Sequence, residues 1–211
     1  SKRRDGYSLM IKIHPLFFVL GILLFFQGYI SLFAVYLFSL LWHEAGHLAA
    51  IKICGLHVER CTLFPFGGEI KMKQTFTSTP RQRLFIAFGG PIATICLLIA
   101  CLFIEHPLIG DIIKINSFLL LINLLPIWPL DGGRIIVATC EMIWKHETIY
   151  NGFITYSFFT LLFACIITVF YLPHSAFLLL NSLLLMEQVF TQWRFRKYYI
   201  ALEKNINRQL T

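Results

Sequence analysis

Residues 40–50 read Leu-Leu-Trp-His-Glu-Ala-Gly-His-Leu-Ala-Ala, and they place three ionisable side chains inside an otherwise apolar stretch that runs from Ser31 to Ile53. A stretch of this length predicts a helix that crosses a bilayer. An ionisable group that faces lipid at the centre of a bilayer costs about 2.5–3.5 kcal/mol. We therefore expect His43, Glu44 and His47 to face the inside of a helical bundle.

The composition of the whole chain also indicates a membrane protein. Of its 211 residues, 57% are hydrophobic and 14% are Asp, Glu, Lys or Arg, whereas soluble domains carry about 25% charged residues. These values exclude a large soluble domain, a disordered protein and a DNA-binding domain. Apolar runs and breakers predict an all-α polytopic fold with six spans, at about 15–29, 31–53, 84–104, from 112 onward with an interruption at Pro126 and Pro129, 152–172 and 175–189.

The basic residues predict the orientation of these spans. All 18 Lys and Arg residues except Lys114 fall in one set of loops and chain ends, and cytoplasmic loops collect such residues. We therefore expect both termini and the segment 56–80 in the cytoplasm. Residues 1–193 are expected to form one six-span domain and 194–211 a basic tail, where mixed aromatic and basic side chains favour an interfacial helix end over a partner-binding segment. The net charge of +7 then reflects orientation, and no nucleic-acid partner is expected.

The spacing of the ionisable residues predicts a metal site. His43 and His47 are four residues apart, which places both imidazoles on one helix face within reach of one metal ion. Glu44 follows the first histidine, where its carboxylate can reach a metal-bound water. A catalytic zinc site usually has three protein ligands, and the best candidate for the third is Asp131, after a helix end broken by two prolines. A buried polar cluster that stabilises helix packing, and an ordinary turn acid at Asp131, are the simpler alternatives.

The polar segment between the second and third spans predicts a small β-hairpin. Residues 69–73 alternate between polar and apolar side chains, as a half-buried strand does, and Pro-Phe-Gly-Gly precedes them. We expect the hairpin, Val58–Lys73, to dip toward the membrane beside the site, where its free edge could pair with an extended substrate backbone. A plain surface hairpin is the alternative. The expected substrate-binding residues are Phe66, Gly67, Gly68, Glu69 and Ile70.

Small residues and cysteines elsewhere favour packing roles. Phe88-Gly89-Gly90-Pro91 indicates a helix break or a close-packing face, because small residues let membrane helices approach one another; gating of substrate entry is the alternative. The six cysteines contain no Cys-x-x-Cys pair, and cysteine inside apolar stretches behaves as a small hydrophobe. We expect neither a disulfide framework nor a cysteine-based metal site.

Two motifs together resemble those of the site-2 protease family of intramembrane zinc metalloproteases. They are His-Glu-Ala-Gly-His at 43–47 and Asn-Leu-Leu-Pro-Ile-Trp-Pro-Leu-Asp-Gly-Gly at 123–133. The second motif and the compact layout most resemble the branch that acts in bacterial endospore formation and releases a sigma factor, sigma-K, from its membrane-associated precursor. The resemblance implies that His43, His47 and Asp131 bind Zn2+, that Glu44 is the catalytic acid/base, and that Asn123 assists near the substrate carbonyl.

The resemblance also implies a location and partners. It implies an enzyme of the bacterial cell membrane, in the outer forespore membrane for the sporulation branch, with membrane-bound inhibitory regulators; homo-oligomerisation is left open. In that branch a regulatory CBS domain, implicated in ATP sensing, follows the last span. Residues 194–211 are too few for one, so we expect either a truncated chain or a smaller relative, and nucleotide control is left open.

Two other classes of function have different sequence requirements. A metal transporter would need ionisable residues distributed over several spans as a relay, whereas here they concentrate at one expected depth. A catalytically silent scaffold for a membrane partner need not keep His43, Glu44, His47 and Asp131 together. Both alternatives are therefore less favoured than a zinc endopeptidase.

Overall fold

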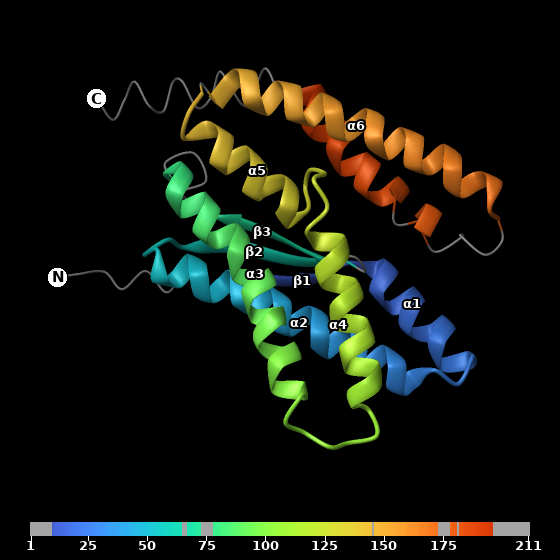
Figure 1. Cartoon of the computed structure of the whole chain (residues 1–211). Helices are drawn as coiled ribbons and strands as arrows, with labels where there is room; N and C mark the ends of the chain where they lie inside the picture. Colours follow the sequence, from blue (N-terminus) through green and yellow to red (C-terminus); the bar gives the residue numbers. More distant parts are fainter. Residues whose placement is uncertain are drawn as a thin grey trace.

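The fold is mainly helical, with a small sheet (Figure 1). The computed structural model describes residues 10–64, 67–72, 78–144, 146–172, 178–180 and 182–195. The elements are β1 (Met10–Ile13), α1 (Pro15–Phe26), α2 (Ile30–Ile53), β2 (Val58–Phe64), β3 (Gly67–Met72), α3 (Pro80–Cys101), α4 (Ile109–Asn123), α5 (Asp131–Glu141) and α6 (His146–Phe170). Residues 178–180 and 182–195 are also helical.

The helix α3 packs against both helices that carry the predicted site. α2, α3 and α4 pack on one another, and α5 packs against α3 and against α6 (Figure 1). The His-Glu-His motif lies on α2, whereas Asp131 is the first residue of α5. Both helices that carry predicted ligands therefore share α3 as a neighbour.

The predicted apolar segments are helical over most of their described residues, and their number as membrane spans stays a prediction. Among the described residues, two helical stretches are long and apolar enough to cross a membrane, Pro80–Cys101 and Ile149–Phe170. α2 has 24 residues but carries the polar motif, and α1 and α4 have 12 and 15 residues. The six-span count and the cytoplasmic placement of the termini are not established by these lengths.

The predicted hairpin is present, and it belongs to a larger sheet than expected. β2 and β3 are antiparallel, with Cys61 opposite Ile70 and Leu63 opposite Gly68. The sequence analysis missed β1, which pairs in parallel with β2 and gives the strand order β1-β2-β3. A strand of four residues is too short to show a clear periodic pattern. Within the described residues β3 pairs with β2 alone and forms the end of the sheet.

Local sequence explains where α3 begins, and the helix continues through an internal proline. The Thr79 hydroxyl accepts from Gln82 N–H and the Gln82 side chain accepts from Thr79 N–H, a capping box with Pro80 as the first helical residue. α3 then continues past Pro91, so a helix break there was the wrong alternative. The close-packing alternative holds, because a side chain at Gly46 of α2 would collide with the backbone of Gly89.

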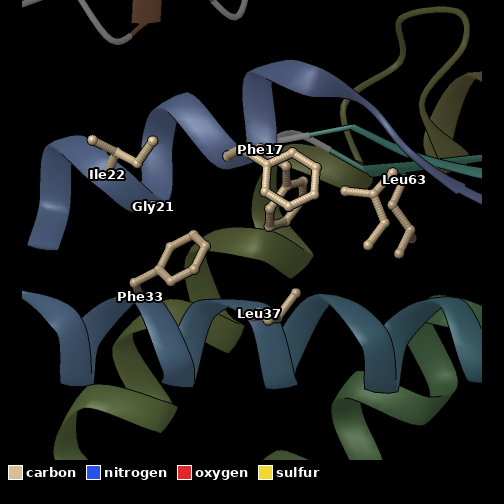
Figure 2. A pocket seen from close by; sticks show the side chains of 8 residues that line it. Phe17, Gly21, Ile22, Phe33, Leu37 and Leu63 are labelled. Carbon is tan, nitrogen blue, oxygen red and sulfur yellow. The ribbon is translucent and has the colours of Figure 1, made fainter.

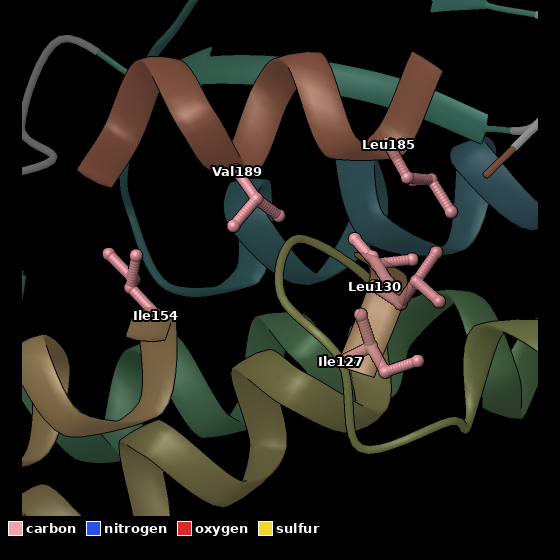
Figure 3. Packing of buried hydrophobic residues seen from close by; sticks show 6 residues of the cluster. Ile127, Leu130, Ile154, Leu185 and Val189 are labelled. Carbon is pink, nitrogen blue, oxygen red and sulfur yellow. The ribbon is translucent and has the colours of Figure 1, made fainter. Parts of the chain in front are cut away.

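The non-helical segment before α5 is fixed by apolar packing and by one hydrogen bond. Ile127 and Leu130 pack with Ile154 of α6 and with Leu185 and Val189 of the helical residues 182–195 (Figure 3). The Ser157 hydroxyl of α6 accepts a hydrogen bond from Trp128 N–H at 3.0 Å. Non-helical backbone within a membrane is tolerated where it is buried in protein, and these contacts supply that burial immediately before Asp131.

An apolar cavity of about 280 Å³ lies between α1, α2 and β2 (Figure 2). Phe33 and Leu37 of α2 face Phe17 and Ile22 of α1 across it, and Leu63 of β2 lies at one end. Its lining contains none of the predicted site residues. The cavity is therefore separate from the polar site.

Candidate metal centre

The structure brings the three predicted metal ligands together. Asp131 Oδ2 lies 3.0 Å from His43 Nε2 and 3.1 Å from His47 Nε2, and the two Nε2 atoms are 3.3 Å apart. The three residues are 1%, 3% and 4% exposed for His43, His47 and Asp131. Two helices that are far apart in the sequence thus supply three potential ligand atoms to one buried point.

The spacing and chemistry of these atoms fit zinc. Ligands about 2.0–2.1 Å from a tetrahedral zinc ion lie about 3.3 Å from one another, close to the separations of 3.0–3.3 Å found here. Two imidazoles and one carboxylate are a donor set that zinc favours, and three protein ligands leave a position for water or substrate. Within the described residues, His43, His47 and Asp131 form a group that could hold a metal ion.

Glu44 lies beside this group with one carboxylate oxygen held and the other free. Its Oε1 accepts a hydrogen bond from Gly68 N–H at 2.7 Å, whereas its Oε2 is buried without a hydrogen-bond partner. The residue is 4% exposed. A buried polar atom without a partner is costly, so Oε2 indicates that this site accommodates a further polar group, such as a water molecule or a substrate.

Two contacts from α3 orient the imidazoles, and the sequence analysis did not predict them. His43 Nδ1 lies 2.9 Å from Thr94 Oγ1, and His47 Nδ1 lies 2.8 Å from the Ile86 carbonyl. Histidines that bind metal usually donate the other ring N–H in this way. Gly90 N–H also lies 3.2 Å from His47 Nδ1, but an Nδ1 that donates to Ile86 cannot accept from it. The shorter contact to Ile86 leaves the lone pair on Nε2, where a metal would bind.

A partly buried ion pair holds the far end of α5 against α3. Arg83 Nη2 lies 2.6 Å from Glu141 Oε2, and the two side chains are 25% and 2% exposed. Asp131 begins α5 and Glu141 ends it. At the start of α5, side chains at Gly132 or Gly133 would collide with the backbone of 124–128. These glycines therefore permit close packing of α5 beside Asp131.

Of the remaining predicted site residues, Gly68 lies against Glu44, whereas Asn123 does not reach the histidines. Gly67, Gly68 and Ile70 lie in β3, with Gly68 against Glu44. Phe66 and the side chain of Glu69 lie outside the described part of the structure. Asn123 is buried at the end of α4, and its amide donates to Leu119 O within that helix instead of reaching the histidines. The roles of these residues in substrate binding and catalysis stay predictions.

Three of the six cysteines, Cys61, Cys101 and Cys165, are buried, whereas Cys96 is exposed. All six are free thiols. Burial, assisted by the negative charge of Glu44, raises the pKa of the Cys61 thiol to about 11. A thiol with such a pKa stays protonated at neutral pH, whereas the thiolate is the form that binds metal. Cys61 also lies close enough to Glu44 for the carboxylate charge to influence this pKa.

Comparisons with known proteins agree with this geometry. The model of peptidase family M50 matches residues 31–110 and 107–167. Stage IV sporulation protein FB of Bacillus subtilis is 28% identical over 134 residues, which are 61% of this chain and 46% of that protein. Zinc metalloprotease MJ0392 of Methanocaldococcus jannaschii is 33% identical over 117 residues, 51% of this chain and 33% of the relative. The chain thus covers less than half the length of these relatives.

A solved structure has the same fold. The site-2 protease from Methanocaldococcus jannaschii superposes with a TM-score of 0.71 at 23% sequence identity, and the match covers 87% of this chain and 90% of that one. The small sheet and the helices around it are therefore an arrangement already seen in a solved protein.

Proposed function

The chain belongs to peptidase family M50, the family of site-2 proteases, as its two motifs predicted, and on this basis we propose that it is an intramembrane zinc endopeptidase. The observation that carries the proposal is the meeting of His43, His47 and Asp131 from two separate helices, with Glu44 beside them. The relatives that are zinc metalloproteases and the donor set of the site agree on zinc as the metal.

The ligand set determines what the chain contributes to the metal. His43 Nε2, His47 Nε2 and Asp131 Oδ2 would hold the ion. Zinc, when bound, lowers the pKa of a coordinated water to about 7 and polarises a carbonyl. The carboxylate of Asp131 reduces the net positive charge that the protein must bury, and its place at the start of α5 fixes it relative to both histidines.

Glu44 is the general base and acid in this proposal. The Gly68 N–H holds Oε1, so the carboxylate keeps one orientation while Oε2 is free to exchange a proton. Glu44 takes a proton from the attacking water and later gives it to the amine of the leaving peptide. Proton transfer by a positioned group contributes roughly 10²–10⁴-fold to the rate.

The free edge of β3 is the proposed site for the substrate backbone. Peptide bonds in a helix are shielded by their own hydrogen bonds, so a substrate must be extended before it is cut, and an extended segment can add to a sheet edge. The contact between Gly68 and Glu44 supports this site, because it places β3 directly beside the proposed catalytic carboxylate. Gly67, Gly68 and Ile70 would contact the substrate, together with Phe66 and Glu69 of the same predicted hairpin. Asn123 would assist near the substrate carbonyl after releasing its contact to Leu119.

We further propose a membrane-associated sigma-factor precursor of the sigma-K type as the substrate. The similarity to stage IV sporulation protein FB supports this choice. The proposal includes a multi-pass protein with both termini in the cytoplasm and membrane-bound proteins that restrain its activity.

Cleavage and metal content together test the proposed function. The chain is co-expressed with a membrane-tethered sigma-factor precursor, and zinc is measured in the purified protein. Wild type should cut the precursor. Glu44→Gln should retain zinc and leave the precursor whole, whereas Asp131→Asn should lose both zinc and cleavage. Asp111→Asn, in the first turn of α4, is the matched control and should keep both.

Three results would contradict parts of this account. Equal cleavage by wild type and Glu44→Gln would remove Glu44 from the mechanism. Unchanged zinc content in Asp131→Asn would place the third ligand elsewhere. Uptake of metal ions into vesicles that contain the purified protein, without cleavage, would favour the transporter alternative.

A further inference from the structure

One face of α3 lies against both imidazoles of the site. Ile86, Gly90 and Thr94 follow one another at intervals of four residues, so they share one helix face, and all three are buried. The two outer members contact the Nδ1 atoms of the histidines, while a side chain on the middle one would collide with both Nε2 atoms.

We propose that Thr94 and Gly90 are positioning residues of the zinc site. Thr94 holds His43 in the tautomer that directs a lone pair at the ion, and Gly90, which has no side chain, leaves the space that the ion takes. This inference rests on the proposed function, since it requires that His43, His47 and Asp131 bind zinc. It adds two residues that act on the ion through the histidines and the space beside them.

The argument for Thr94 starts from its contact with His43. Thr94 Oγ1 lies 2.9 Å from His43 Nδ1, and the residue is fully buried. The hydroxyl can accept the Nδ1 proton, which leaves Nε2 unprotonated and able to bind metal. For His47, the Ile86 carbonyl accepts the Nδ1 proton instead, and no side-chain substitution removes a backbone carbonyl. Of the two acceptors, the Thr94 hydroxyl is therefore the one that a side-chain substitution can remove.

The argument for Gly90 starts from the space that a side chain would fill. A Cβ at Gly90 would lie 2.5 Å from His43 Nε2 and closer still to His47 Nε2. Zinc binds imidazole nitrogen at about 2.0–2.1 Å, so the methyl group of an alanine would compete with the ion for nearly the same space. The neighbouring Gly89 differs, because a Cβ there would meet Gly46 O and Ala50 Cβ of α2. Gly89 thus serves helix packing, and Gly90 serves the metal.

Thr94→Val and Thr94→Ser test the first assignment. Zinc affinity is measured by competition with a chelating dye in detergent-purified protein, and the absorption spectrum of the Co2+-loaded protein reports the ligand geometry. Thr94→Val should bind zinc about 10–100-fold more weakly and change the Co2+ spectrum, whereas Thr94→Ser should restore both. Thr160→Val in α6, whose hydroxyl donates to Tyr156 O, is the matched control and should leave both unchanged. A Thr94→Val protein with a lower melting temperature but wild-type affinity and spectrum would overturn the assignment.

Gly90→Ala tests the second assignment. It should weaken zinc binding about a hundredfold or more, at the upper end of the effects known for residues behind a metal site. The circular dichroism of the metal-free protein should stay that of the wild type. Gly152→Ala, at a helical position where a Cβ would meet nothing within 4 Å, should bind zinc normally. Wild-type zinc affinity in Gly90→Ala, or loss of its helical content without metal, would overturn the role of Gly90.

His43→Ala separates this inference from the function on which it rests. If His43→Ala abolishes zinc binding while Thr94→Val and Gly90→Ala bind zinc normally, the metal site is supported and the positioning roles are contradicted. If His43→Ala binds zinc as the wild type does, the metal site itself is wrong, and the inference falls with it.

Discussion

Gly68 lies so close to Glu44 that a side chain at this position would displace the carboxylate. A Cβ built on Gly68 would collide with both carboxylate oxygens of Glu44, while the Gly68 N–H holds Oε1. Gly68→Ala should therefore reduce cleavage by roughly 10²–10⁴-fold, the usual contribution of a positioned general base. Zinc content should not change, because Gly68 touches none of the three ligands in the contacts described above.

Cleavage of the membrane-tethered precursor and zinc content, measured on the same preparation, check this prediction. Gly110→Ala, which has open space around its Cβ, should behave as the wild type in both measurements. Full cleavage by Gly68→Ala would mean that β3 does not approach Glu44 this closely in the working enzyme.

At the residue scale, sequence predicts the groups that are costly in a membrane and misses those that are not. His43, Glu44 and Asp131 stand out because an ionisable group in an apolar segment needs a partner or a function. Thr94 does not stand out, because a threonine in an apolar helix usually bonds its own backbone. Thr155 and Thr160 do so in α6, where each hydroxyl donates to the carbonyl four residues earlier.

At the scale of elements, the ion pair between Arg83 and Glu141 stabilises the packing of α5 on α3. Glu141 is almost fully buried in this pair, and the loss of one partner of a buried pair costs about 3–5 kcal/mol. Arg83 is partly exposed, so Arg83→Gln should fall near the lower end of this range. We expect it to lower the melting temperature and also the zinc affinity, because α5 carries Asp131.

Thermal unfolding and dye competition on Arg83→Gln, Glu141→Gln and the double variant check this prediction. The double variant should be less destabilised than the sum of the single variants, because the two side chains contact each other directly and their effects couple. Arg81→Gln, two residues before Arg83 in α3 and exposed, is the matched control. Strictly additive effects would show that the pair does not couple the two helices.

The elements differ in how well their sequences determine them. Long apolar runs predict the helices, and the polar-apolar alternation of 69–73 predicts β3. β1 has no such pattern, because it is defined by its parallel partner β2. Pro91 suggests a break, but α3 continues through it, since membrane helices tolerate a proline where neighbouring groups satisfy the freed backbone.

At the scale of the whole molecule, a bound zinc ion would link α2 to α5. A ligand that binds only the folded protein stabilises it, by about 2.7 kcal/mol at a concentration 100-fold above its Kd. Zinc should therefore raise the melting temperature, and a chelator should abolish cleavage reversibly. The metal-free protein should keep its helical content, because the packing of α3 on α2, α4 and α5 does not depend on the ion.

Differential scanning fluorimetry with added zinc or chelator checks this prediction. The His43→Ala protein should show no shift in melting temperature with zinc, which separates binding at this site from binding elsewhere. An equal shift in wild type and His43→Ala would contradict the link between the two helices.

The motifs alone do not determine which distant segments of the chain come into contact. His47 and Asp131 are 84 positions apart in the sequence. The sequence indicates that they meet only because both are expected at a similar depth in the membrane. The structure supplies the reason that they meet, because α3 packs against both helices and the cluster of Ile127, Leu130 and Ile154 fixes the segment before Asp131. Such contacts between distant segments have no local signal in the sequence.

X-ray absorption spectroscopy at the zinc edge of the purified, zinc-loaded protein tests the metal site most directly. The site described here predicts two imidazole nitrogens and carboxylate oxygen at about 2.0–2.2 Å. A spectrum dominated by sulfur at about 2.3 Å, or one without imidazole scattering, would contradict it.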